Sequence, residues 1–156
     1  MVPQRSRRRR KNQSVFILIG DGFDELEVVF FLHKFREAGI CIKSVSLFNK
    51  LVYSRQGVGL KADYALADEP FSPAENCVLI LPTGGLNGDA LRRDARVRNL
   101  LHAFKQDPGR IVLTDSESDL AHDVEQLFRQ QTTMHERQNE PLDRFVDQLA
   151  QQMAYV

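Results

Sequence analysis

The residues best placed to do chemistry lie where an apolar run turns polar, within Arg110–Ser118. The run Ile111–Thr114 predicts a short buried strand, and the amphipathic segment after it predicts a helix. In α/β proteins, ligands and nucleophiles gather at the carboxyl ends of such strands. The residue at this corner is Asp115, followed by Ser116, with no cysteine or glycine beside it. The chemistry of the site therefore depends on what an acid does at this position.

The same corner also has an explanation without chemistry. Asp115, Ser116 or Ser118 is a good N-cap for the following helix, and the acids Glu117 and Asp119 suit the positive end of its dipole. Ser116 is a weak nucleophile here, because no base is evident and Glu117 stands where a sharp elbow needs glycine. Capping is the interpretation that the residues favour.

Length and charge predict one domain with a basic arm. A chain of 156 residues with 42% hydrophobic residues is long enough for one real core. Residues 1–14 hold six basic side chains and no acid, whereas residues 115–156 hold nine acids and three arginines. We expect a disordered arm over 1–14 and a single α/β domain over 15–156. The basic residues of the arm are Arg5, Arg7, Arg8, Arg9, Arg10 and Lys11. They predict either binding of nucleic acid or an acidic protein, or a solubilising tail.

Two cysteines, Cys41 and Cys77, lie in apolar runs and are expected to be free, buried thiols. No apolar run approaches the roughly 18 residues of a membrane span. These features predict a cytoplasmic protein without a membrane segment. No cofactor is indicated, and no resident metal.

Hydrophobic periodicity predicts the order of the elements. Three apolar runs predict buried strands, and a segment of alternating polarity at 40–47 predicts a fourth strand. Segments with helical spacing lie between strands. This alternation predicts a doubly wound, mainly parallel sheet with helices on both faces. The expected elements are strands at 15–20, 40–47, 77–81 and 111–114, helices at 24–38, 89–104, 120–128 and 142–153, a hairpin at 51–62, a helical turn at 64–68 and a loop at 130–139.

The first helix and a glycine loop are the other notable features. Leu26–Phe35 is apolar nearly all round, which is typical of a central helix or of a subunit interface, and His33 is expected to be packed there. Thr83, Gly84 and Gly85 follow the strand 77–81, and Gly22 makes an earlier turn. Such loops let backbone amides approach a ligand or a neighbouring side chain.

Three stretches, in this order and spacing, together resemble the DJ-1/PfpI family over roughly residues 15–118. They are Phe16–Glu27, Arg36–Ile40 and Leu79–Gly85, the last being similar to the family's Leu-Pro-Gly-Gly loop with Thr83 inserted or substituted. The resemblance implies a flavodoxin-like three-layer sandwich of the class I glutamine amidotransferase-like superfamily. It also implies a divergent, C-terminally shortened member that lacks late strands before its final helix.

The resemblance further implies roles for single residues. Glu27 matches the family's glutamate that hydrogen-bonds a reactive cysteine, and Asp115 falls at the position of that cysteine. The thiolate nucleophile is therefore absent, as in a pseudoenzyme. Members commonly dimerise through the first-helix region, which implies a homodimer through Leu26–Phe35.

Three functions follow as expectations. The first is a non-catalytic binding or assembly module. The second is a small hydrolase or glyoxalase-like enzyme, in which Glu27 and Asp115 share a proton for acid–base catalysis or hold a cation with Asp21 or Glu117. The third is a nucleic-acid-associated protein that binds through its basic arm.

Overall fold

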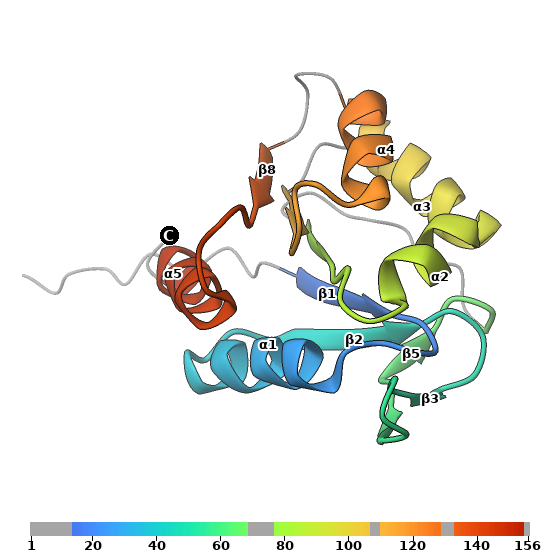
Figure 1. Cartoon of the computed structure of the whole chain (residues 1–156), viewed down its shortest axis with the longest axis horizontal. Coiled ribbons are helices and arrows are strands. Elements are labelled where there is room, and N and C mark those ends of the chain that lie inside the picture. Colours follow the sequence, from blue (N-terminus) through green and yellow to red (C-terminus); the bar gives the residue numbers. More distant parts are fainter. Residues whose placement is uncertain (1–13, 69–76, 107–109, 129–132, 155–156) are drawn as a thin grey trace, which may run out of the picture.

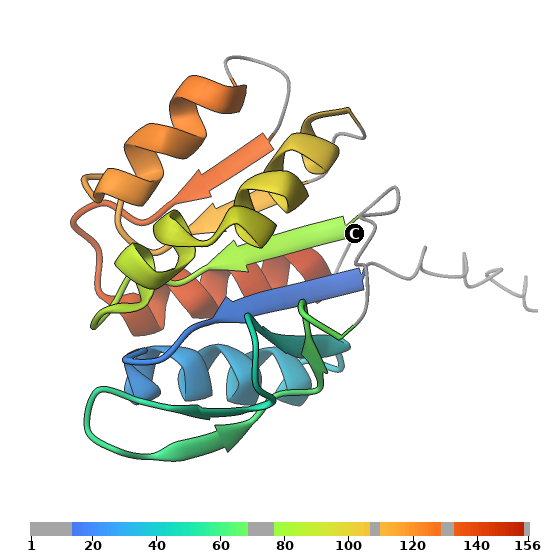
Figure 2. The ribbon, with the colours of Figure 1, turned by 90° about the vertical axis from the view of Figure 1, so that its right-hand side faces the viewer.

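A six-stranded parallel sheet forms the centre of the protein, in the strand order β5-β2-β1-β6-β7-β8 (Figure 1). The computed structural model describes residues 14–68, 77–106, 110–128 and 133–154. The strands of this sheet are β1 (Ser14–Ile19), β2 (Ile42–Ser46), β5 (Tyr64–Ala65), β6 (Cys77–Leu81), β7 (Arg110–Leu113) and β8 (Thr133–Glu136). Their arrows point the same way in Figure 2, so their carboxyl ends form one edge of the sheet.

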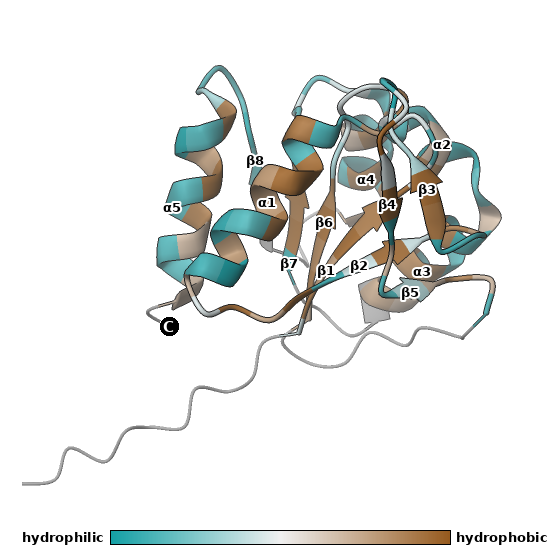
Figure 3. Ribbon diagram, turned by 90° about the horizontal axis from the view of Figure 1, so that it is seen from below, coloured by the Kyte–Doolittle hydropathy of each residue, from teal (hydrophilic) through white to brown (hydrophobic). Residues whose placement is uncertain are grey.

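Five helices cover the two faces of the sheet. α1 and α5 lie on one side of the strands, and α2, α3 and α4 lie on the other (Figure 3). The helices are α1 (Glu25–Glu37), α2 (Asn87–Arg93), α3 (Ala95–Gln106), α4 (Asp119–Phe128) and α5 (Leu142–Ala154). This arrangement confirms the predicted doubly wound, flavodoxin-like sandwich.

Alternation along the strands divides the core into two layers. In β1, Ile17 and Ile19 face the α1–α5 layer, whereas Leu18 faces the layer of α2, α3 and α4. All three side chains are fully buried. Successive side chains of a strand point to opposite faces, so a strand covered on both faces is apolar throughout. This is why the sequence shows unbroken apolar runs here.

Both ends of α1 carry residues that typically end helices. The carboxylate of Asp24 accepts hydrogen bonds from the backbone N–H groups of Leu26 and Glu27, at 3.0 and 3.4 Å. Gly39, with φ of 76°, ends the helix in the left-handed conformation that glycine adopts without strain. His33 does not pack in the core of the chain, because its side chain is 66% exposed and pairs with Glu37, whereas a place in a subunit interface stays a prediction.

Three predicted elements are corrected by the structure. Part of the expected loop 130–139 is strand β8, and this strand precedes the final helix. Its sequence is polar because an edge strand with a partly exposed face needs few apolar side chains. The expected helix 89–104 is broken at Asp94, whose extended backbone and side-chain bond to the N–H of Arg96 start α3. The expected helical turn at 64–68 begins with the short strand β5.

The two cysteines differ in environment. Both are free, but only Cys77 is buried, and burial raises the pKa of its thiol to about 12. Cys41 is exposed, because it precedes β2 instead of lying within it. The expectation that both thiols are buried is therefore wrong for Cys41.

The predicted arm lies almost wholly outside the described residues, so it stays a prediction. Among the helices that the structure describes, none has the length and apolar character needed to cross a membrane.

Asn87, at the start of α2, joins the ends of two central strands. Its side-chain oxygen accepts from the N–H of Gly20 at 2.6 Å, and its amide donates to the carbonyls of Leu18 and Pro82 at 3.2 and 2.7 Å. The side chain is fully buried. It therefore satisfies three backbone groups that water does not reach.

We expect Asn87→Ala to lower the free energy of unfolding by about 3 kcal/mol, since three buried backbone groups lose their partner. Urea unfolding followed by circular dichroism measures the change. Asn99→Ala, at an exposed position of α3, is the matched control and should change stability by less than about 0.5 kcal/mol. Equal effects of the two substitutions would contradict the role given to Asn87.

Candidate functional site at the carboxyl edge of the sheet

Glu27, in the first turn of α1, is a buried carboxyl with 5% of its surface exposed. One of its oxygens, Oε1, accepts a hydrogen bond from the N–H of Gly84 at 3.2 Å and another from the hydroxyl of Thr114 at 3.1 Å. Gly84 follows β6 and Thr114 follows β7, so the carboxyl joins helix α1 to the ends of both strands. Glu27 is the residue that the resemblance to DJ-1/PfpI proteins matches to the family's glutamate, and that match stays a prediction.

Two threonine hydroxyls fill the space next to this carboxyl. Thr114 Oγ1 accepts from the N–H of Thr83 at 2.8 Å and lies 3.0 Å from Thr83 Oγ1. A hydroxyl has one proton, so if Thr114 donates to Glu27, Thr83 is the donor to Thr114. The hydroxyls then form a chain that ends at the carboxyl. Thr114 is fully buried, and Thr83 is partly exposed.

Burial raises the pKa of Glu27, and the hydrogen bonds from Gly84 and Thr114 oppose this rise because they favour the charged form. Two charged neighbours act in opposite directions. The carboxylate of Asp24 raises the pKa of Glu27 further, whereas the guanidinium of Arg137 lowers it. The site thus holds an acid whose proton affinity is above the ordinary value.

Asp115 points away from this network. Its side chain is exposed, and its carboxylate accepts from the N–H of Glu117 at 3.0 Å. The residue that bonds Glu27 is Thr114, one position earlier, and the charges that act on Glu27 in the described part of the chain come from Asp24 and Arg137.

The cap of α4 is Ser118. Its hydroxyl accepts from the N–H of Ala121 at 3.1 Å and donates to the carbonyl of Asp115 at 2.9 Å. The N–H of Ser116 donates to the carbonyl of Arg137 at 3.1 Å. The corner residues are therefore engaged in building the turn into α4.

The glycines of the predicted ligand loops bring backbones together at this edge. A Cβ on Gly84 would lie 2.8 Å from Oε2 of Glu27, and one on Gly85 would clash with the carbonyl oxygen of Gly22. Gly22 and Gly85 both have positive φ, at 84° and 59°. Backbone and carboxyl thus occupy the room that a side chain would need at these glycines.

Arg137, directly after β8, is a site residue that the sequence did not reveal. Its Nε donates to the carbonyl of Thr114 at 2.8 Å and its Nη1 to the carbonyl of Glu140 at 3.1 Å. It therefore ties the elbow after β7 to the loop before α5. The segment read as a polar loop, so nothing in the sequence placed this arginine beside Glu27.

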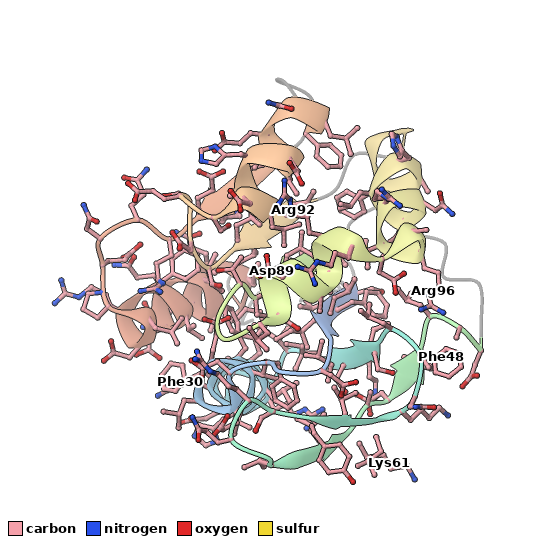
Figure 4. The ribbon with its side chains drawn as sticks, turned by 45° about the vertical axis from the view of Figure 1, so that its right-hand side comes forward. Phe30, Phe48, Lys61, Asp89, Arg92 and Arg96 are labelled. Carbon is pink, nitrogen blue, oxygen red and sulfur yellow. The ribbon has the colours of Figure 1, made fainter. Side chains whose placement is uncertain are left out.

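Two arginines of α2 and α3, Arg92 and Arg96, are paired with carboxylates. Arg92 pairs with Asp123 at 2.6 Å and with Asp119 at 3.6 Å. Arg96 pairs with Asp94 and lies over the ring of Phe48 (Figure 4). These exposed ion pairs are typical of a solvated helix surface. Across the described segments, no group of three or more histidine, cysteine or acidic side chains is arranged to hold a metal ion.

Comparison with known proteins identifies the family. Residues 13–118 match the model of the DJ-1/PfpI family. The chain belongs to the DJ-1/PfpI family. This confirms the resemblance seen in the sequence. No curated protein matches the sequence closely enough to count as a relative.

Solved DJ-1 structures share the fold at low sequence identity. Oxidised DJ-1 from Toxoplasma gondii has a TM-score of 0.67 and 14% identity, covering 90% of this chain and 95% of its own. DJ-1beta from Drosophila melanogaster has a TM-score of 0.65 and 17% identity, covering 92% and 91%. DJ-1 from Schizosaccharomyces pombe has a TM-score of 0.64 and 18% identity, covering 90% and 89%. This DJ-1/PfpI protein therefore shares the fold over most of its length.

A test of the buried carboxyl uses the pH dependence of stability. A raised folded-state pKa means that Glu27 favours folding below its ordinary value of 4.5, and that this contribution is lost as the pH rises through the folded-state pKa. Glu27→Gln cannot ionise. We therefore expect its stability relative to the wild type to increase as the pH is raised from about 4 to 8.

Urea unfolding at a series of pH values measures this difference. Glu37→Gln, at a position of the same helix whose side chain is 62% exposed, is the matched control and should follow the wild type. A relative stability of Glu27→Gln that falls with increasing pH would refute the raised pKa.

Proposed function

We propose that this protein is a non-catalytic, cytoplasmic member of the DJ-1/PfpI family that acts as a homodimeric binding or assembly module. The observation that carries the proposal is how the carboxyl of Glu27 is hydrogen-bonded. Its accepting oxygen is engaged by Gly84 and Thr114, and the Thr114 hydroxyl is fully buried. A nucleophile must meet both a base and a substrate. Glu27 is the only buried acid of the described residues. The Thr114 hydroxyl that contacts it is not accessible to a substrate.

The position of the family's cysteine supports the same proposal. The resemblance matches Asp115 to that position, and the carboxylate of Asp115 is exposed and bonded within its own turn. Enzymatic use of Glu27 and Asp115 as a pair would require the two carboxyls to approach and share a proton. Thr114 and Thr83 supply the polar partners at that place instead.

The surface of α1 supports the dimer. Val28, Phe31 and Phe35 are buried against the sheet and α5, but Leu26 and Val29 are 78% and 49% exposed. Leu86, beside Gly22, is also 54% exposed. Exposed apolar side chains that gather on one surface are typical of an interaction site. We propose that a second copy covers them.

Binding of nucleic acid or an acidic protein through residues 5–11 is the remaining expectation. These residues lie outside the described ones, and deletion of residues 1–13 tests their role. A salt-dependent affinity for single-stranded DNA that survives the deletion would exclude the arm as the binding element.

For catalysis, we expect no turnover of methylglyoxal or of an activated ester above the rate without protein. Glu27→Gln, Asp115→Asn and the control Glu37→Gln should all match the wild type within the error of the assay. Steady-state kinetics at several pH values measure this. Wild-type turnover that falls by about 100-fold in Glu27→Gln and Asp115→Asn, but not in Glu37→Gln, would establish the carboxylate enzyme instead.

For assembly, we expect the wild type to be a dimer and Leu26→Glu to weaken it at least about 10-fold, or about 1.4 kcal/mol. The substitution places a charge in the proposed interface. Because Leu26 is exposed in the monomer, the fold of the monomer should stay intact. Light scattering and sedimentation over a concentration series measure the dissociation constant. Phe48→Glu, at a side chain that is 65% exposed beside Arg96, is the control and should leave the dimer unchanged. A monomeric wild type would refute the proposed dimer.

A further inference from the structure

The last strand of the sheet, β8, brings one acid into contact with another. Met134 of β8 packs against the core layer of α2, α3 and α4. Glu136 lies two residues further on, so its side chain points to the same face of the strand. β8 lies between α4 and α5 in Figure 1, and Glu136 therefore faces α4. Its partner on that helix is Glu125, and the two carboxyls are hydrogen-bonded to each other.

The orientation of α4 explains this contact. Asp119 and Asp123 lie on the flank of α4 that faces α2, where both pair with Arg92. With about 3.6 residues per turn, residues three apart share a flank, and His122 and Glu125 lie on the flank opposite to this acidic pair. That second flank faces β8. The contact thus follows from how the strand and the helix are packed.

Two carboxyls in hydrogen-bond contact need a proton between them. A carboxylate only accepts hydrogen bonds, so one member of the pair must be protonated to donate. None of the ion pairs within the described segments includes Glu125 or Glu136, so no lysine or arginine of those segments neutralises them. On β7, the residue in register with Glu136 is the apolar Leu113. The polar groups that face Glu136 come from α4.

The surroundings of Glu136 favour its protonated form near neutral pH. Its side chain is only partly exposed. Burial and the contact with Glu125 raise the pKa of Glu136 to about 7, whereas the positive charge of His122 acts against this rise. A proton therefore stays on the pair at pH values where an isolated glutamate has lost it.

We propose that Glu125 and Glu136 form a pH-sensitive latch, in which a shared proton holds the end of β8 against α4 and loss of the proton releases it. The contribution of the latch to stability is complete below the ordinary glutamate value of 4.5 and is lost as the pH rises through about 7. Above that pH both carboxylates are charged and repel each other.

The latch acts on the candidate site through the next residue, Arg137. The N–H of Arg137 donates to the carbonyl of Leu113 at 3.0 Å, and its Nε donates to the carbonyl of Thr114 at 2.8 Å. Release of Glu136 loosens the end of β8 and both of these bonds with it. The guanidinium that lowers the pKa of Glu27 is then held less firmly. The carboxyl edge of the sheet thus responds to pH near neutrality through a pair that lies outside the Glu27 network.

NMR of the glutamate carboxyl carbons in the full chain tests the shared proton. In the wild type we expect Glu136 to titrate with a midpoint of about 7, and Glu125 to report the same steps, because a coupled pair titrates as a unit. In Glu125→Gln the midpoint of Glu136 should fall by about 1 pH unit or more, since the repelling charge is gone and the amide donates to the carboxylate. Glu117→Gln, at an exposed position before the same helix, is the control and should leave the midpoint unchanged.

Amide exchange of the N–H of Arg137 tests the release. In Glu136→Gln the side-chain amide donates to Glu125 at every pH, so the strand end stays held. Between about pH 5 and 8 we expect the protection factor of this N–H to fall about 10-fold further in the wild type than in Glu136→Gln. Glu117→Gln should follow the wild type.

The possible results are distinct. A midpoint of Glu136 near its ordinary value, or one that Glu125→Gln leaves unchanged, would overturn the shared proton and the latch with it. Equal loss of protection in the wild type and in Glu136→Gln would overturn the latch even if the proton is shared. Neither result bears on the dimer or on the absence of catalysis, which the variants of Leu26 and Glu27 test separately.

Discussion

A buried carboxyl must be supplied with hydrogen-bond donors, and the carboxyl edge of this sheet is built to supply them to Glu27. Leaving such a group without partners costs several kcal/mol. The donors come from the loop after β6 and from the end of β7, and Arg137 at the end of β8 adds a positive charge. These segments can meet at the start of α1 only if the strands end at one level. A parallel sheet with this strand order provides that level.

The same requirement explains the crowding of the edge. Gly84 must come close enough for its N–H to reach the carboxyl, and its lack of a side chain makes this possible. Gly22 and Gly85 let two further loops touch, and Asn87 bonds the backbone beneath them. Each contact leaves less room for a ligand. The edge gains rigidity from these contacts, and the Thr114 hydroxyl that bonds its buried acid is itself fully buried.

The hydrophobic periodicity of the sequence predicts most elements of the fold but few of the contacts in the site. The apolar runs of β1, β6 and β7 are long enough to identify central strands, and α1, which Asp24 caps and Gly39 ends, lies within the range that its spacing predicts. β8 escaped prediction because an edge strand needs only part of an apolar pattern. The positions of Thr114 and Arg137 depend on how the strands are ordered and where they end. That information lies in tertiary contacts, and no local spacing of residue types contains it.

Glu27 has a structural role at this edge of the sheet that does not depend on a thiolate partner. Family membership is shown by the sequence over residues 13–118, and it directs attention to this glutamate as a catalytic group. In this chain its replacement would leave the N–H of Gly84 and the hydroxyl of Thr114 with one partner fewer in a buried place. A residue that accepts both hydrogen bonds at this position supports the fold. A glutamate at the family's position therefore marks the architecture of the edge, and chemistry requires a reactive group that is accessible beside it.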